Sequence, residues 1–409
     1  MNTGTSKGLP SVMIERLRKL SLPAVSAVIL FCSYHYGRVL GVICFDIGKR
    51  TSDQSLVGRN RNRLKWYCLS LRLISATSVL CFCAPHVAEI EDRYIWMLQF
   101  LRLSASLICS ICIIVVQIGY EKELLRMINS FLRLFRRVRR LSSLKRIGFG
   151  GKREFFLLTI KFICLVYELY CELCQLGHLH TLLMLSTMMW DIILEIGSLM
   201  IIHIGFFGYL TVAALYSELN RFVRGELRRQ LRSLERPGGG PVSRRQLRIV
   251  ENRLDECISV YDEIERVGRS FHRLFEFPVL IILIVKIFAT AVLSYEVIIR
   301  SELYPSKAGM WGLVVKSFAD VILLTLAVHE AVSSSRVVRH LSLENCPISD
   351  HKEWHVKWEM FLSRLNFFEF RVRPLGLFEV SNEVILLFIS SMITYFTYVV
   401  QYGIQTHLL

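Results

Sequence analysis

Seven stretches of the chain are dominated by apolar residues. Each holds about 20 such residues, the length at which an α-helix crosses the hydrocarbon layer of a bilayer. The stretches are residues 66–87, 94–120, 154–180, 189–217, 276–299, 309–332 and 378–402. Because only helices and closed barrels satisfy their backbone hydrogen bonds in lipid, this pattern predicts an all-α, polytopic membrane protein with seven transmembrane helices.

An eighth apolar run, residues 24–47, differs from the others because ionisable residues interrupt it and both of its flanks are basic. Residues 1–23 carry four Lys or Arg against one Glu, and residues 48–65 carry six against one Asp. A crossing would therefore place one basic flank outside, against the usual bias of Lys and Arg toward the cytosol. We predict a re-entrant or interfacial helix at this position instead.

Composition supports a membrane protein, and the distribution of charge gives its orientation. Hydrophobic residues make up 53% of the 409 residues and the mean hydropathy is +0.43, which exceeds what one soluble core would bury. With an internal N-terminus, the inner segments 1–23, 48–65, 121–153, 218–275 and 333–373 have net charges of +3, +5, +9, +4 and +2, a total of +23. The short outer segments total about −1, and the spans hold the remaining −6 of the net +16. The N-terminus is therefore predicted inside and the C-terminus outside.

The basic residues lie between spans, so we expect them to face membrane lipids and expect no nucleic acid partner. In residues 121–153, apolar positions at helical spacing alternate with arginines, which predicts a basic amphipathic helix on anionic headgroups. A solvated extension of the preceding span is the alternative. From Leu247 to Phe275 an apolar residue recurs at every third or fourth position, which predicts a helix that packs on a partner in a cytosolic helical anchor.

The predicted organisation follows from these assignments. It comprises a cytosolic N-terminal region with the re-entrant or interfacial helix (1–65), spans one to four (66–217) with their basic inner loop (121–153), a cytosolic anchor segment (218–275), spans five and six (276–332), a second anchor segment (333–377), span seven (378–402) and an extracellular tail (403–409).

Acidic residues occupy the outer halves of spans three to five. Ionisable groups inside a bilayer are costly, so they either serve function or pair with one another. The candidate pocket residues are Glu168, Glu172, Trp190, Asp191, Glu195 and Glu296. Carboxylates beside aromatic rings suit an ammonium group, so we hypothesise an outer pocket for a cationic, nitrogenous ligand. Internal pairing of these acids with Arg102 and Lys316 is the alternative.

The last span carries a polar stripe. Read as a helix, it places Ser390, Thr394, Thr397 and Gln401 on one face of an otherwise apolar rod. Polar groups on one face of a membrane helix suit helix–helix hydrogen bonds or the lining of an aqueous pore. Because one helix cannot enclose a pore, several subunits would each contribute one, with Gln401 and Tyr402 near the outer constriction.

A short motif ends this span. Leu375-Gly376-Leu377-Phe378 is followed by Thr394-Tyr395 and, after five residues, by Gln401-Tyr402. This ending resembles that of insect gustatory receptors, whose signature is Thr-Tyr, five mostly apolar residues and Gln-Phe, with Tyr402 here in place of Phe. The resemblance implies a tetrameric, ligand-gated, non-selective cation channel. It also implies that the seventh helix of each subunit lines a shared pore and that a small-molecule tastant binds in an outer pocket.

We therefore predict a taste receptor subunit for bitter or other nitrogenous tastants, in a homo- or hetero-tetramer in the plasma membrane of sensory-neuron dendrites. A membrane transporter is the alternative. A G-protein-coupled receptor fits less well, because Asp92-Arg93-Tyr94 precedes the second span on the outer side. The sequence has no glycine loop that would cradle phosphates, and we expect no enzymatic activity, no cofactor and no metal site.

Overall fold

The computed structural model describes residues 22–49, 56–89, 93–141, 149, 151–176, 182–230, 244–299, 307–336, 356–357, 359–361, 363, 370–376, 379 and 382–405. The long helices are α2 (Leu22–Val39), α3 (Asn62–Ser78), α5 (Arg93–Gly119), α6 (Glu121–Leu141), α7 (Lys152–Leu176), α8 (Leu182–Phe222), α10 (Arg244–Ile299), α11 (Lys307–Arg336) and α13 (Asn382–Gln405). The short elements are strands β1 (Phe45–Lys49) and β2 (Leu56–Asn60), helix α4 (Ala84–Ala88), π-helical turns η1 (Val79–Cys83) and η2 (Val223–Leu227), and a 3₁₀ turn η4 (Pro374–Gly376).

Five helical segments in the described part of the chain are long and apolar enough to cross a membrane. They are Asn62–Cys83, Gln99–Gly119, Leu185–Gln230, Leu247–Tyr295 and Trp311–Arg336. They coincide with predicted spans one, two, four, five and six. The seventh span contains a shorter apolar helical run, Ile385–Gln401. The third falls on α7, whose apolar sequence is interrupted by Lys161, Glu168 and Glu172.

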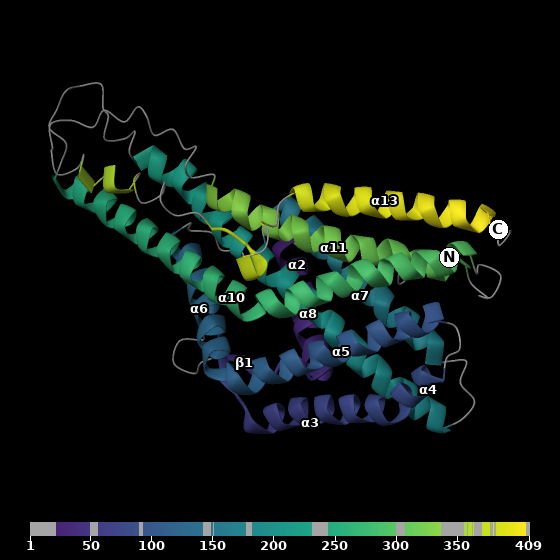
Figure 1. Cartoon of the computed structure of the whole chain (residues 1–409). Coiled ribbons are helices and arrows are strands. Elements are labelled where there is room, and N and C mark those ends of the chain that lie inside the picture. The colour runs from purple at the N-terminus through teal and green to yellow at the C-terminus, as the bar shows by residue number, and fades with distance from the viewer. Residues whose placement is uncertain are drawn as a thin grey trace, which may run out of the picture.

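Helix α8 occupies the centre of the bundle. It contacts α3, α5, α6, α7, α10 and α11, and Figure 1 shows α3 and α13 at opposite edges of the bundle. Its middle is largely apolar, with Ser198 and His203 as buried polar exceptions, as expected for a helix surrounded by other helices. Ile201, Phe206 and Leu210 are at most 2% exposed. The bundle is therefore organised around this helix.

Helix α10 continues without interruption for 56 residues. The sequence divides this stretch into an anchor segment and a span because its charge changes abruptly, but the backbone remains helical through both. The predicted apolar seam is buried, with Leu254, Ile264 and Phe271 at most 3% exposed, and it packs on α6 and α8 of the same chain. Pro278 lies inside the helix and lacks a backbone donor, and Figure 1 shows the helix changing direction along its length.

A β-hairpin corrects the all-α prediction locally. Helix α2 ends at Val39, Gly41 turns the chain with a φ of 70°, and β1 then pairs with β2 in antiparallel register, Phe45 opposite Asn60. Glycine suits this position because a positive φ strains other residues. Asn129 of α6 contacts β2, because its Oδ1 accepts a hydrogen bond of 2.8 Å from the Gly58 amide. The helix thus ends about two turns before the end of the predicted run at residue 47.

Helix α6 confirms the predicted amphipathic helix, but one of its faces packs on protein. Leu124, Met127, Leu134 and Val138 are buried, and the helix contacts α8, α10 and β2. The guanidinium of Arg137 pairs with Glu263 of α10 at 3.1 Å. Contact of the remaining exposed arginines with lipid headgroups stays a prediction.

Candidate functional site

An ionic cluster lies near the predicted outer ends of α5, α7 and α8. The guanidinium of Arg102 pairs with the carboxylate of Asp191 and with Glu195, whose Oε2 lies 2.9 Å from Nη2. Asp191 and Glu195 are one turn apart on α8, so one guanidinium reaches both. We call Arg102, Glu172, Asp191 and Glu195 the outer cluster. Its side chains are only partly buried, with Arg102 37% exposed and Glu195 22% exposed.

Glu172 gives the outer cluster an excess of negative charge. It projects from the last turns of α7, within electrostatic range of Glu195 and Arg102. Within the described part of the chain no ion pair or hydrogen bond of this carboxylate is seen. The outer cluster therefore contains three carboxylates and one guanidinium, which pairs with two of them. The predicted internal pairing with Arg102 occurs for Asp191 and Glu195. Glu172 does not take part in it.

A second ionic cluster lies deeper, between α7, α8 and α11. Lys316 Nζ contacts Glu168 Oε1 at 2.7 Å and Asp320 Oδ2 at 2.8 Å, and Lys161 Nζ contacts Asp320 Oδ1 at 2.6 Å. His203 Nε2 lies 3.4 Å from the other oxygen of Glu168. We call these five residues the central network. Their side chains are at most 5% exposed.

Glu168 pairs with Lys316 in the central network, as expected if the acids of the spans pair internally. Lys286 of α10 is also buried and interacts electrostatically with Glu168 and Asp320. Sequence reasoning did not single out Lys161, Asp320 or Lys286. Each stands alone in the middle of an apolar run, and that isolation is the signal that could have identified it.

Trp190 and Glu296 are the two remaining candidate pocket residues, and the structure describes the side chain of only the first. Trp190 precedes Asp191 on α8 and is partly exposed. Glu296 lies on α10, but its side chain falls outside the described part of the structure. The ligand-binding role of all these residues stays a prediction.

The predicted polar stripe lies on the outward face of α13. Ser390, Thr394, Thr397 and Gln401 are exposed, whereas Phe388, Met392 and Val399 on the other side are at most 6% exposed. The buried face packs on α10 and α11. The hydroxyls of Thr394 and Thr397 donate to the carbonyls of Ser390 and Ile393 one turn earlier. The side chain of Tyr402 is outside the described residues.

Residues 370–376, which precede α13, contact α10 of the bundle. Phe370 is buried and packs against Gly268 of α10, where a methyl group would clash with its ring. His272 of α10 lies 2.9 Å from the Tyr209 hydroxyl through Nδ1 and 3.3 Å from the carbonyl oxygen of Arg373 through Nε2. A hydrogen-bonded chain therefore runs from α8 through α10 to the segment that leads into α13.

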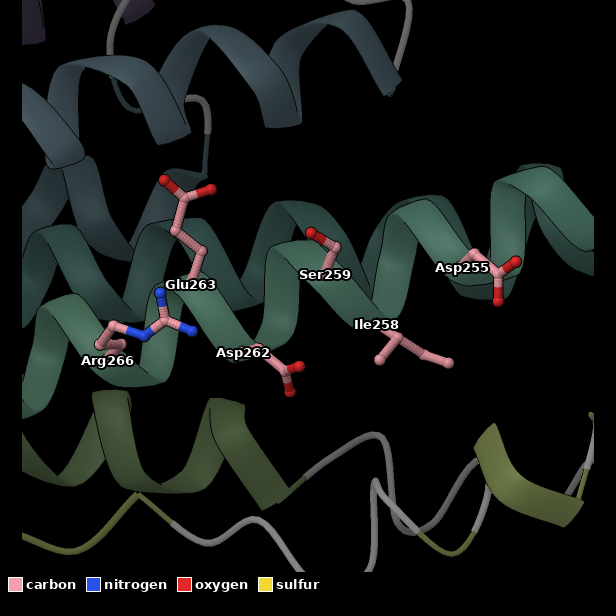
Figure 2. A pocket seen from close by; sticks show the side chains of 6 residues that line it. All are labelled: Asp255, Ile258, Ser259, Asp262, Glu263 and Arg266. Carbon is pink, nitrogen blue, oxygen red and sulfur yellow. The ribbon is translucent and has the colours of Figure 1, made fainter.

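A surface hollow of about 350 Å³ lies on the part of α10 that is predicted to be cytosolic. Figure 2 shows that Asp255, Ile258, Ser259, Asp262, Glu263 and Arg266 all project from this one helix. Arg137 of α6 reaches Ser259 and Glu263 at its edge. The hollow is thus a packing feature between helices and not an enclosed ligand site. No group of three or more residues suited to metal binding occurs in the described part of the chain.

Comparison with known proteins identifies the family. Residues 30–406 match the family model described as 7tm chemosensory receptor, and the chain therefore belongs to that family. It is 81% identical over 395 residues to gustatory receptor 93c of Drosophila melanogaster, covering 97% of this chain and all of the relative. It is 39% identical over 396 residues to gustatory receptor 93b of the same species, covering 97% and 98%.

Two more distant similarities extend this result. The gustatory receptor for bitter taste 93a of Drosophila melanogaster is 23% identical over 356 residues, covering 84% of each chain. The fold is similar to that of the insect olfactory receptor OR5 from Machilis hrabei in complex with eugenol, with a TM-score of 0.58, 11% identity and coverage of 92% and 98%. The resemblance seen at the end of the chain is thus confirmed. The protein is a membrane-spanning chemoreceptor of the gustatory type.

Proposed function

We propose that this chemoreceptor is one subunit of a ligand-gated, non-selective cation channel in the plasma membrane of sensory-neuron dendrites. Its chain crosses the membrane seven times, with α7 and α13 as the third and seventh crossings, and has its N-terminus inside and its C-terminus outside. Four subunits, identical or related, surround one pore. Its ligands are bitter or other nitrogenous small molecules.

The observation that carries the channel proposal is the one-sided attachment of α13. This helix uses Phe388, Met392 and Val399 to join its own bundle, and among the described residues its exposed polar stripe makes no hydrogen bond to another helix. Thr394 and Thr397 satisfy their hydroxyl donors on their own helix, but the exposed amide of Gln401 would be costly toward lipid, because hydrocarbon offers it no hydrogen bonds. Water in a pore shared by several subunits removes that cost.

Cysteine accessibility tests the pore assignment. In cells that express the receptor and respond to an agonist, we expect a cationic, membrane-impermeant thiol reagent to block current through Thr394→Cys and Thr397→Cys. Met392→Cys, on the buried face of the same helix, is the matched control and should remain insensitive, as should the unmodified receptor with its own cysteines. Equal sensitivity of the three variants, or an unchanged conductance in Gln401→Ala, would contradict the assignment.

The outer cluster is the proposed site for the ligand's positive charge. Its excess carboxylate, Glu172, can pair with an ammonium group without displacing Arg102 from Asp191 and Glu195. Trp190 lies beside these acids on α8 and could add its ring face to an ammonium. The name of the related receptor for bitter taste agrees with this ligand class.

A panel of tastants tests the ligand proposal. Denatonium and quinine serve as cationic probes and sucrose as the uncharged one. We expect Glu172→Gln to raise the half-maximal concentration of a cationic agonist about tenfold, since a charge-assisted hydrogen bond is lost. Glu123→Gln on α6 is the matched control. An unchanged dose–response curve in Glu172→Gln would argue against this site, and agonist-driven flux without current would favour the transporter alternative.

A further inference from the structure

A second, largely apolar cavity lies away from the outer cluster. Its volume is about 360 Å³, and α2, β1, α5, α6, α8 and α10 form its walls. Helix α5 contributes residues of its last two turns, and α10 contributes residues that include Pro278. The cavity therefore lies where the transmembrane bundle meets the inner helices.

The walls of the cavity are suited to an apolar occupant. Five phenylalanines line it, together with aliphatic and methionine side chains; they are Phe131, Phe135, Phe207, Phe271 and Phe275. Two of its polar wall groups are satisfied within the protein. The Tyr34 hydroxyl donates to the Phe45 carbonyl at 3.0 Å, and the Ser33 hydroxyl donates to the Ile29 carbonyl at 2.9 Å.

Gln117 is the exception among these wall groups. Its side chain is 2% exposed, and Nε2 donates to the carbonyls of Gly41 at 2.9 Å and Val42 at 3.0 Å. These two bonds fix the orientation of the amide, because the reverse assignment would place its oxygen against two carbonyl oxygens. Oε1 is buried and has no hydrogen-bond partner in the described part of the chain. A buried acceptor of this kind indicates a missing donor.

We propose that this cavity binds a small apolar molecule with one hydroxyl donor, an alcohol or a phenol, whose hydroxyl donates to Oε1 of Gln117. An apolar cavity of about 150 Å³ holds one benzene molecule, so this volume suits about ten to fourteen non-hydrogen atoms. The site differs from the outer cluster in both position and chemistry. Its occupant contacts α10 beside Pro278.

Two probes with the same carbon skeleton test the proposal on the purified full-length receptor in lipid nanodiscs. In 4-propylphenol the hydroxyl can donate, whereas in 4-propylanisole it is methylated and cannot. Apparent dissociation constants are taken from the rise in unfolding temperature with probe concentration. We expect the phenol to bind about five- to tenfold more tightly than the anisole, and Gln117→Leu to remove this preference.

A second pair of variants keeps the test independent of Gln117, should its replacement prevent folding. Val116→Phe adds bulk to the cavity wall and should weaken both probes at least tenfold. Val115→Phe, the same change at an exposed neighbour on α5, should leave both unchanged. Equal affinity for the two probes in the unmodified receptor would overturn the proposal and favour a lipid acyl chain as the occupant. Equal binding by Val116→Phe and Val115→Phe would also overturn it.

Discussion

The two ionic clusters contain similar residue types but differ in burial and in charge balance. In the central network every carboxylate contacts at least one ammonium group, and the side chains are almost completely buried. In the outer cluster one guanidinium pairs with two of three carboxylates, and the side chains remain partly exposed. Buried charges have to be matched because desolvation is costly, whereas partly hydrated charges can remain in excess. The first arrangement is a balanced, buried network, and the second leaves the excess carboxylate that the proposed ligand site requires.

The largest expected effect comes from unbalancing the central network. Asp320→Asn leaves the Lys161 ammonium without its carboxylate in a buried site, which should lower the free energy of unfolding by about 3–5 kcal/mol. The measurement is thermal stability of the detergent-solubilised receptor by size-exclusion chromatography. The double variant Lys161→Met/Asp320→Asn should recover much of the loss. Equal stability of Asp320→Asn and the unmodified receptor would remove the distinction between the clusters.

A smaller effect is expected when the outer cluster loses its cation. Arg102→Met separates Asp191 and Glu195 from their partner, but these carboxylates remain accessible to water and protons. The expected loss of stability is about 1–2 kcal/mol, below that of Asp320→Asn. The same thermal assay checks it. A loss as large as that of Asp320→Asn would assign the outer cluster a structural role.

The smallest effect on stability is expected for Glu172→Gln. Because this carboxylate has no partner among the described residues, neutralising it should change the free energy of unfolding by less than about 0.5 kcal/mol. Arg221→Ala, which opens an exposed pair with Glu218, should cost about as little and serves as the reference. A stability loss above 1 kcal/mol at Glu172 would indicate that it packs or pairs within the chain.

The sequence predicts features that depend on neighbouring residues, and it predicts less well those that depend on contacts between distant parts of the chain. The apolar runs located the helices because crossing a bilayer needs only length and composition. The polar stripe of α13 was equally visible, since its residues share one helix face. The central network was visible only in part, because Lys161 and Asp320 lie 159 positions apart and meet only in the folded bundle. The hairpin and the continuity of α10 also depend on packing, which charge and hydropathy do not encode.

The continuous α10 has a mechanical consequence. At 1.5 Å per residue its 56 residues form a rod of about 84 Å, longer than the hydrocarbon layer is thick by a factor of more than two. One continuous helix of this length contacts α11 and α13 in the bundle and also α6. Pro278 removes one backbone hydrogen bond along it and so makes bending easier at one point than elsewhere. The point at which this helix bends most easily therefore lies beside the apolar cavity.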